Sequence, residues 1–532
     1  MLSKIHQFTS NAVKKSLIRM LPKLLFSALL FLSTTLSAQT PAADTTIAGQ
    51  TLPLLPIETL IAQLQRPANG PAIVHRQVAF RGRLFAPTSG LDTLRVPLDL
   101  EEVYFLDEVS FSQVVFLAPV RFKRAHFAGG LSCAEASFTA AFSLRASHLA
   151  KHATFQKTHF LGDADLTASR FAGVASFVSA HFAGQRTHFA QTQFDEAAYF
   201  EQAAFAAPAT FTDAAFAGIA SFKETTWTQS LSFAGVRFAD RALFWDARFA
   251  EEVSFDSGRA DGEVAFDRAR FSGEASFADF TFAQAARFRR ATFGRARFDG
   301  AYFRREADFS ESEGRVLRLS AFFNRSLDLS RAAFALIDLR ATGADSTFAA
   351  GGHLYLHQPR FGRIQVRWPQ LAGHLATADS THAAPLDPTY AALYHQFLAQ
   401  GLNGDAAACH AERMDHQRLA RAWNEPARWG LELWRLSSAY GTAPQRIIAF
   451  MLAIVLLCGL AYRTASGSMR SASGADQPTL ADCIVFSLYT FIHVNSRAYD
   501  ATGKLKLLAV AEALLGWVSF GLLIAAALAH VL

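Results

Sequence analysis

The amino-acid sequence predicts a β-solenoid followed by short soluble helices and an α-helical transmembrane hairpin. Three observations lead to this fold class. Phe recurs rhythmically through the first half of the chain, the rhythm fades after Gly314, and two long apolar stretches lie near the C-terminus. A fixed sequence period over so many residues is typical of a solenoid, in which each repeat packs on its neighbours.

The rhythm runs from Phe105 to Phe309 in alternating gaps of six and five residues, with one slip near His188–Phe189. Eleven residues is close to three α-helical turns. In a helix, however, steps of five and six would place successive Phe on opposite flanks. Gly and Pro also recur between the Phe residues, and both are costly inside a helix. Strands therefore fit this pattern better than helices.

A small residue usually stands two positions before each Phe, as Ala175 does before Phe177. Residues two apart in a strand face the same side of the sheet, so each repeat offers one small side chain and one ring to a narrow interior. We expect these side chains to be buried and the rings to stack between coils. The expectation covers Ala175, Ala180, Phe177, Phe182, Phe211, Phe216, Phe277 and Phe293.

Units such as residues 175–184 and 291–298 resemble the pentapeptide-repeat family, and the resemblance extends over about residues 101–345. It implies a right-handed quadrilateral β-helix whose central Phe or Leu points inward. The regular unit of the family has five residues, whereas sixes alternate with fives here, so four units predict about 22 residues per coil. Nine or ten coils spaced by ~4.8 Å would make a rod of about 45 Å.

The segments before the rhythm predict an export signal and a cap. Residues 1–38 have a basic region, an apolar run at Leu24–Leu36 and a small residue at Ala38, as secretory signal peptides do. An uncleaved anchor is the alternative. Residues 39–100 are expected to cap the open first coil, with a short amphipathic helix at Ile57–Leu64.

The rhythm predicts the β-helix over residues 101–350, and residues 351–443 are interpreted as a linker with short helices. Three helices are expected there, and they begin at Pro388, Asp405 and Pro426 and end near Leu398, Trp423 and Tyr440.

Residues 444–532 predict a two-span membrane domain. Ile447–Tyr462 and Leu505–Leu532 are apolar and long enough to cross a bilayer. Leu480–Val494 between them is apolar but too short, which indicates a re-entrant or interfacial segment. The lipid bilayer is thus a predicted partner, and the hairpin is the predicted place of self-association.

The order of these segments, with Phe486–Phe491 and Leu508–Gly516, resembles the pore domain of two-transmembrane potassium channels over residues 445–532. A potassium filter presents the backbone carbonyls of Thr-Val-Gly-Tyr-Gly. The aligned stretch from Thr490 to Arg497 has no Gly, so potassium selectivity is not expected. The resemblance implies these pore or filter-like residues: Thr490, Ile492, His493, Asn495, Arg497 and Glu512.

Ionisable residues within a bilayer usually have a function, and Glu512 is the candidate inside the second span. The alternative is that Asp482 caps the short helix, that His493 and Arg497 lie in a wet loop, and that Glu512 reaches the interface. The inter-span loop is rich in Arg and Lys, so the positive-inside rule places it in the cytoplasm. The repeat domain would then be exported to the periplasmic or extracellular side, which inverts the usual channel orientation.

One basic cluster late in the repeats could bind a phosphate, an anionic glycan or a lipid headgroup. It comprises Arg289, Arg290, Arg295, Arg297, Arg304 and Arg305. The alternative is a solvated exterior that is partly balanced by Asp299, Glu306 and Asp308. Basic and acidic residues are nearly equal in number between residues 101 and 350, which argues against DNA mimicry and against nucleic-acid binding.

The sequence contains no phosphate-binding loop, nucleophile elbow or zinc-type His-Glu-x-x-His motif, so no enzyme, cofactor or metal site is predicted. The leading interpretation is a non-enzymatic, membrane-anchored scaffold or binding rod for an unnamed protein or anionic ligand. The alternative is an ion channel, or a channel-like protein, with a degenerate filter that is not selective for potassium.

Overall fold

The computed structural model describes residues 46–47, 50–66, 70–340, 347–376, 387–471, 477–494 and 499–531. The chain divides into two units, Met1–Pro53 and Leu54–Leu532. In the first unit, strands β1 (Thr46–Ile47) and β2 (Gln50–Thr51) form an antiparallel pair. The predicted signal at residues 1–38 lies outside the described residues.

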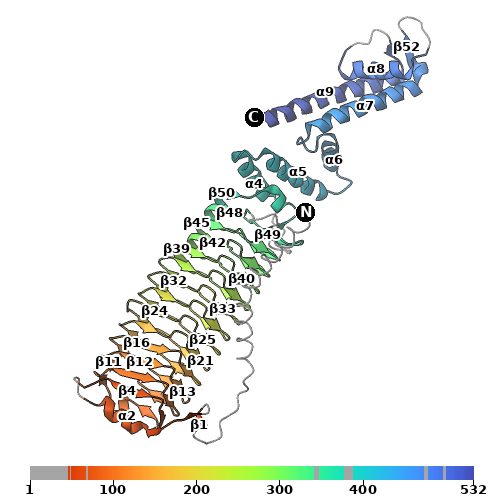
Figure 1. Cartoon of the computed structure of the whole chain (residues 1–532). Helices are drawn as coiled ribbons and strands as arrows, with labels where there is room; N and C mark the ends of the chain where they lie inside the picture. Colours follow the sequence, from red (N-terminus) through yellow and green to blue (C-terminus); the bar gives the residue numbers. More distant parts are fainter. Residues whose placement is uncertain are drawn as a thin grey trace, which may run out of the picture. The chain divides into compact units, whose positions relative to one another are not determined.

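A parallel β-solenoid of about 14 turns runs from strand β3 (Leu54–Pro56) to strand β51 (Leu375–Ala376) (Figure 1). Its regular coils hold four short strands each, and each strand pairs in parallel with the strand of the next coil. His126 pairs with His148, which is 22 residues further on, as the Phe spacing predicts. One regular coil consists of β13 (His126–Phe127), β14 (Leu131–Ser132), β15 (Ser137–Phe138) and β16 (Phe142–Arg145).

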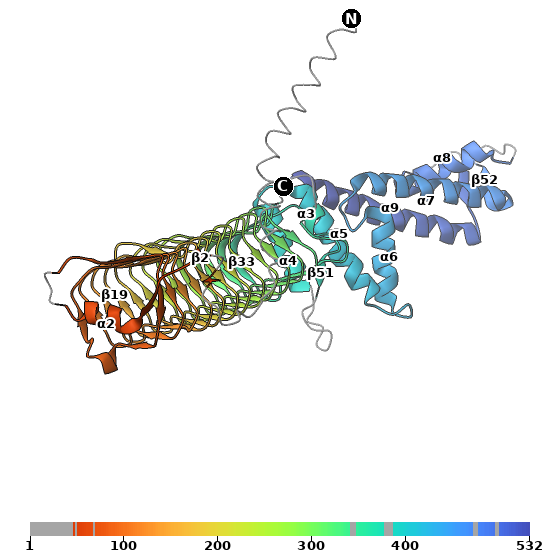
Figure 2. The same cartoon turned by 60° about the horizontal axis from the view of Figure 1, so that its bottom comes forward.

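Equivalent strands stack into ladders that follow the direction in which the coils are stacked, as Figure 2 shows. One ladder has 13 strands and includes β13, and a second has 14 strands and includes β14. The ladders of β15 and β16 join in a single sheet of 22 strands. Every coil therefore buries its inward side chains among four ladders and turns the alternate side chains outward.

The core consists of Phe rings stacked from coil to coil. Phe200 lies between Phe177 and Phe222, with ring centroids 4.8 Å apart on both sides and interplanar angles of 4° and 8°. The small residues that precede the rings, such as Ala175 and Ala180, are buried beside them. The prediction of buried rings is confirmed, since Phe177, Phe182, Phe211, Phe216, Phe277 and Phe293 are each at most 1% exposed.

The slip in the rhythm is one additional residue at a corner. Ala164 pairs with Thr187 rather than with the residue 22 positions on, and Phe189 stays buried in the core. The backbone N–H groups of Gln185 and Arg186 both donate to Asp163 Oδ1, at 2.8 and 3.0 Å. These bonds satisfy the two backbone N–H groups of the displaced corner, so the insertion leaves the core undisturbed.

The solenoid is longer than the Phe rhythm indicates. Coils begin at Leu54, before residue 101, and end at Ala376, so the prediction of nine or ten coils is too small. Aliphatic side chains occupy the inward positions of the additional coils, for example Leu84, Leu100 and Leu354. A Leu or Val at an inward position fills the core, but it does not mark a period in the sequence as Phe does.

Helices close both ends of the solenoid. The predicted helix α2 (Ile57–Leu64) lies between β3 and β4 (Ile73–Arg76) in the first coil and buries Ile57, Leu60 and Leu64 in the core. At the other end, helix α4 (Asp387–Ala399) buries Leu393 and Phe397 in the same core.

Helix α4 also covers the edge of the last long strand, β50 (Arg360–Gln365). Gln396 Nε2 donates to the Gly362 carbonyl at 3.3 Å, and Gln400 Nε2, just beyond the helix, donates to the Ile364 carbonyl at 2.8 Å. These bonds occupy strand carbonyls that would otherwise accept hydrogen bonds from the N–H groups of a further coil, which protects the edge from pairing with another chain.

The C-terminal region is helical, at positions close to those predicted. Helices α5 (Asn403–Leu419) and α6 (Pro426–Ser438) precede α7 (Pro444–Thr464), α8 (Leu480–Phe491) and α9 (Lys504–Val531). Within the described residues, Gln445–Thr464 and Lys504–Ile524 are long and apolar enough to cross a membrane. The short helix α8 packs against both α7 and α9, and β52 (Met469–Ser471) pairs with β53 (Tyr499–Ala501) beyond them.

Replacing Phe200 with Ala should reduce the free energy of unfolding of the solenoid by about 3–5 kcal/mol, because the ring fills a closed space between two others. Urea unfolding followed by far-UV circular dichroism measures this change. Leu161→Ala is the matched control, since Leu161 is an exposed apolar side chain on the same solenoid. Equal effects of the two substitutions would contradict the stacked core.

Candidate functional site

The predicted basic cluster is distributed around the solenoid rather than gathered in one patch. Arg295 and Arg297 lie on β42 (Thr292–Arg297), in the 22-stranded sheet. Arg289 and Arg290 lie at the corner that precedes this strand. Arg304 and Arg305 lie at a different corner, between β43 (Tyr302–Phe303) and β44 (Glu306–Asp308), which belong to the other two sheets.

Carboxylates neutralise several of these arginines. Arg289 lies 3.6 Å from Asp308, and Arg290 lies 2.8 Å from Glu311. Arg304 instead places its guanidinium 5.8 Å from the ring centroid of Tyr302. Of the acids expected to balance the cluster, Asp308 does so, whereas Glu306 pairs with Arg325. This arrangement agrees with the solvated exterior, and anion binding by the cluster stays a prediction.

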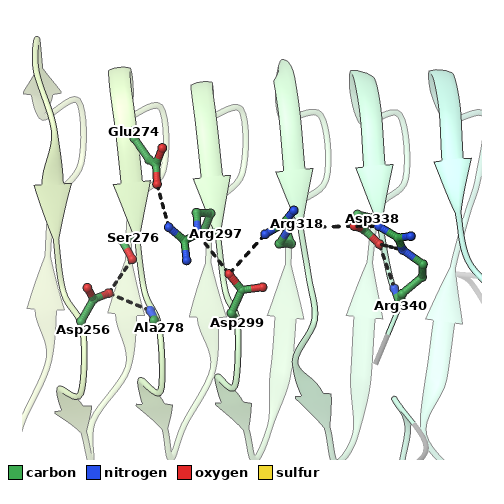
Figure 3. Close-up of polar contacts among 9 residues, drawn as sticks. All are labelled: Asp256, Glu274, Ser276, Ala278, Arg297, Asp299, Arg318, Asp338 and Arg340. Atoms are coloured by element: carbon green, nitrogen blue, oxygen red, sulfur yellow. Dashed lines mark hydrogen bonds and ion pairs between the residues drawn. The ribbon is translucent and has the colours of Figure 1, made fainter. Parts of the chain in front are cut away.

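Arg297 belongs to a row of charges that crosses successive coils on one face (Figure 3). It lies 3.1 Å from Glu274 and 3.0 Å from Asp299. Arg318 continues the row, 3.8 Å from both Asp299 and Asp338. Exposed ion pairs contribute little individually, about 0–1 kcal/mol, so the row mainly sets an alternating charge pattern on this face.

Asp338 anchors one end of the row. Its side chain is almost buried, and Arg340 reaches it with its guanidinium at 2.7 Å and its backbone N–H at 3.1 Å. Burial alone would raise the pKa of Asp338, but the hydrogen bonds from Arg340 hold that pKa below its usual value. At the other end, Asp256 accepts from Ser276 Oγ and from the Ala278 backbone N–H, at 2.5 and 2.9 Å.

An open trough of about 500 Å³ lies on the same sheet, next to the corner insertion. His188, Thr210, Ser232 and Ser254 occupy one outward column there, in register from coil to coil. The last three are small, so the surface is hollow between longer side chains. Its lining also includes Arg186 and Glu252. Pro208 and Leu231 add apolar surface to the lining, and no pattern in the sequence pointed to this trough.

Two histidines stack on another face of the solenoid. The Nδ1 atoms of His126 and His148 are 3.0 Å apart, and their ring centroids are 4.7 Å apart. Burial, together with the charge of the neighbouring His148, lowers the pKa of His126 to about 4. Burial and the nearby Arg170 also lower the pKa of His148. The pair is therefore neutral at pH 7, with one ring donating to the other.

The histidine pair makes the stability of the solenoid dependent on pH. Because the folded-state pKa of His126 is about 4 and the unfolded value is 6.5, the unfolded chain binds more protons between these values. The free energy of unfolding should thus fall as the pH drops from 6.5 toward 4. His126→Phe should reduce this slope in urea titrations. His159→Phe, a matched change at an exposed position, should not; equal slopes in the two variants would contradict the assignment.

In the C-terminal region, one carboxyl joins three helices. Glu512 of α9 is buried, and it accepts hydrogen bonds from Tyr462 Oη of α7, at 2.7 Å, and from Ser487 Oγ of α8. Glu512 is thus enclosed by the three helices, and the interpretation that it reaches the membrane interface stays a prediction. Tyr462 and Ser487 lie 50 and 25 residues away in sequence, so the apolar pattern of α9 did not reveal them.

The other filter-like residues lie at the end of α8. Thr490 Oγ donates to the Phe486 carbonyl of its own helix at 2.9 Å, and Ile492 is exposed just beyond the last turn. His493 has a left-handed backbone, with φ of 59°, and its ring centroid lies 5.3 Å from that of Trp517. Asn495 and Arg497 are outside the described residues.

The beginning of α8 is capped as expected. Thr479 Oγ accepts from the Asp482 backbone N–H, and the Asp482 carboxylate accepts from the Thr479 backbone N–H at 2.9 Å. Near the other end, Gly516 of α9 approaches the Phe491 carbonyl so closely that a Cβ would lie 2.1 Å from its oxygen. Both ends of α8 are thus fixed, which holds Ser487 against Glu512.

Glu512→Leu should destabilise the hairpin, because Tyr462 Oη would lose its acceptor and Ser487 Oγ would keep only the Val455 carbonyl. An unsatisfied buried donor costs about 1–3 kcal/mol. Thermal unfolding of the detergent-solubilised protein measures the loss. Glu512→Gln is the matched control, since its amide oxygen still accepts; an unchanged melting temperature for Glu512→Leu would refute the three-helix junction.

The repeats match a known family. Residues 155–204, 211–259 and 266–313 fit the family model for pentapeptide repeats (9 copies), which confirms the predicted family for the solenoid. The matched residues lie outside the C-terminal helices, so the resemblance of residues 445–532 to a channel pore domain stays a prediction. No curated protein and no solved structure is significantly similar to the chain.

Proposed function

Because its repeat region is built of pentapeptide repeats, we propose that this chain is a non-enzymatic, membrane-anchored protein whose solenoid acts as a scaffold or binding rod. The observation that carries the proposal is a single aromatic core, closed by helices at both ends and followed by two apolar helices of membrane-spanning length. A solenoid of this kind presents outward side chains at fixed intervals, which suits contact with an extended partner surface.

The trough between Arg186 and Ser254 is the proposed contact region for a protein or another polar ligand. Its hydroxyls, with one His, one Arg and one Glu, can donate and accept hydrogen bonds. Most arginines of the basic cluster are paired or packed on rings, so the cluster is a weaker candidate for anion binding than the trough. We further propose that the coils wind right-handed, as the family resemblance implies and as parallel strand connections favour.

The bilayer is the proposed environment of α7 and α9. Their outer faces expose large apolar side chains, including Leu452, Leu457, Leu514 and Trp517, which would be costly in water and favourable in lipid. The positive charges of Arg463, Arg470, Lys504 and Lys506 favour a cytoplasmic position for the segment between the spans. The solenoid, before the first span, would then lie on the exported side.

Impermeant maleimide labelling of intact cells tests the anchoring and the topology together. A cysteine introduced at Ser179, on the solenoid, should react from outside, whereas one at Ser468 should react only after lysis. The chain with Cys458→Ala and no introduced cysteine is the control, because Cys458 is part-exposed whereas Cys133, Cys409 and Cys483 are buried. Labelling at Ser468 with protection at Ser179 would reverse the proposed orientation, and labelling of both in intact cells would exclude it.

A further inference from the structure

Helix α6 presents an apolar face that no other described element covers. Trp429, Leu433 and Leu436 follow one another at helical spacing and are 60%, 51% and 62% exposed. Trp423, which precedes the helix, is also exposed and lies against it: Trp429 Nε1 donates to the Trp423 carbonyl at 3.1 Å. Soluble helices normally turn such a stripe toward the core.

A polar network ties one flank of α6, beside the apolar face, to α5. Arg418 of α5 donates to Glu432 of α6, to Asp415 at 3.0 Å, and to Tyr440 Oη at 3.1 Å. Tyr440 Oη in turn donates to Asp415 at 2.7 Å. These bonds hold the flank of α6 at Glu432 against α5, while Trp429, Leu433 and Leu436 beside it stay exposed.

The apolar face lies next to the first proposed span. Helix α6 packs against α7, and five residues separate the two helices. The first turns of α7 expose Ile448 and Leu452. Exposed apolar side chains are thus present both on α6 and on the first turns of the segment proposed to enter the bilayer.

The side chains on this face suit the headgroup region of a membrane. Trp is enriched at the boundary between headgroups and acyl chains, and interfacial helices combine such rings with Leu and Arg. The Arg428 guanidinium lies 3.9 Å from the ring centroid of Trp423, which supports the indole beside the helix. Helix α6 is also amphipathic rather than apolar all round, unlike α7 and α9.

We propose that α6, together with Trp423, lies in the interfacial plane of the bilayer that α7 and α9 cross. The occupant of its apolar face is the lipid boundary, with Trp429, Leu433 and Leu436 inserted below the headgroups. The inference rests on the proposed membrane anchoring. Through the bonds from Arg418 to Glu432 and Tyr440, the membrane-bound helix would also hold α5, which packs on the cap of the last coil.

Fluorescence quenching of the full chain in lipid nanodiscs tests this proposal. The discs contain phosphatidylcholine and phosphatidylglycerol, and a single environment-sensitive fluorophore is attached through Leu433→Cys in a Cys458→Ala background. Leu433 is exposed, so its replacement leaves the packing of α6 intact. Ala408→Cys, at an exposed position on α5, is the matched control expected to remain in water. Leu457→Cys, exposed on α7, reports on the span itself.

The label at Leu433 should be quenched by lipids spin-labelled near the headgroup more strongly than by lipids labelled deep in the chain. Its quenching by aqueous iodide should be several-fold weaker than at Ala408. The label at Leu457 should respond most to the deep spin label. If Leu457 responds and Leu433 behaves like Ala408, the interfacial helix is excluded while anchoring stands.

If Leu457 also behaves like Ala408, the anchoring itself fails, and the inference fails with it. Discs loaded with one copy of the chain separate the lipid from a second copy as the occupant. Protection of Leu433 that is lost in single-copy discs would show that another copy covers α6, and it would overturn the proposal.

Discussion

Stacking of inward Phe rings from coil to coil is the constraint from which the other features of the solenoid follow. Phe255, Phe277 and Phe298 stack with centroid distances of 4.8 and 4.7 Å, although the last interval is shorter than 22 residues. A ring that left its column would open a cavity and expose its neighbours. Changes in coil length are therefore accommodated at corners, as at Gln185 and Arg186, where backbone bonds to Asp163 absorb the additional residue.

The same period sets the positions of the outward side chains, because each of them lies beside the equivalent outward side chain of the next coil. Arg268 pairs with Asp246, 22 residues before it, at 2.6 Å. Arg290 pairs in the same way with Glu311, which is 21 residues after it. Opposite charges that lie one coil apart in the sequence therefore indicate an ion pair between neighbouring coils. Such pairs neutralise Arg290 and Arg297 of the basic cluster through carboxylates of neighbouring coils.

The solenoid and the helices were predictable because their signals are local and repeated. Phe marks each coil, and long apolar runs mark α7 and α9. The coils at Leu84 and Leu354 were missed because an aliphatic residue in a core position is indistinguishable from one in any other strand. The burial of Glu512 depends on Tyr462 and Ser487, which only the folded hairpin brings to it. Periodicity predicts that α6 is amphipathic. It does not predict which side of α6 packs on α5, because that depends on tertiary contacts such as the bond from Arg418 to Glu432.

A continuous series of contacts connects the last coil to the first apolar helix. Helix α4 closes the strand edge through Gln400, and Arg367, which follows β50, pairs with Asp405 of α5 at 2.5 Å. Helix α5 then holds α6 through Arg418, and α6 packs on α7. The described helices between the solenoid and α7 are thus joined to their neighbours by contacts, among them the charge-assisted pair of Arg367 and Asp405. An ordered connection of this kind is what the proposed role, a scaffold held at a membrane, would need.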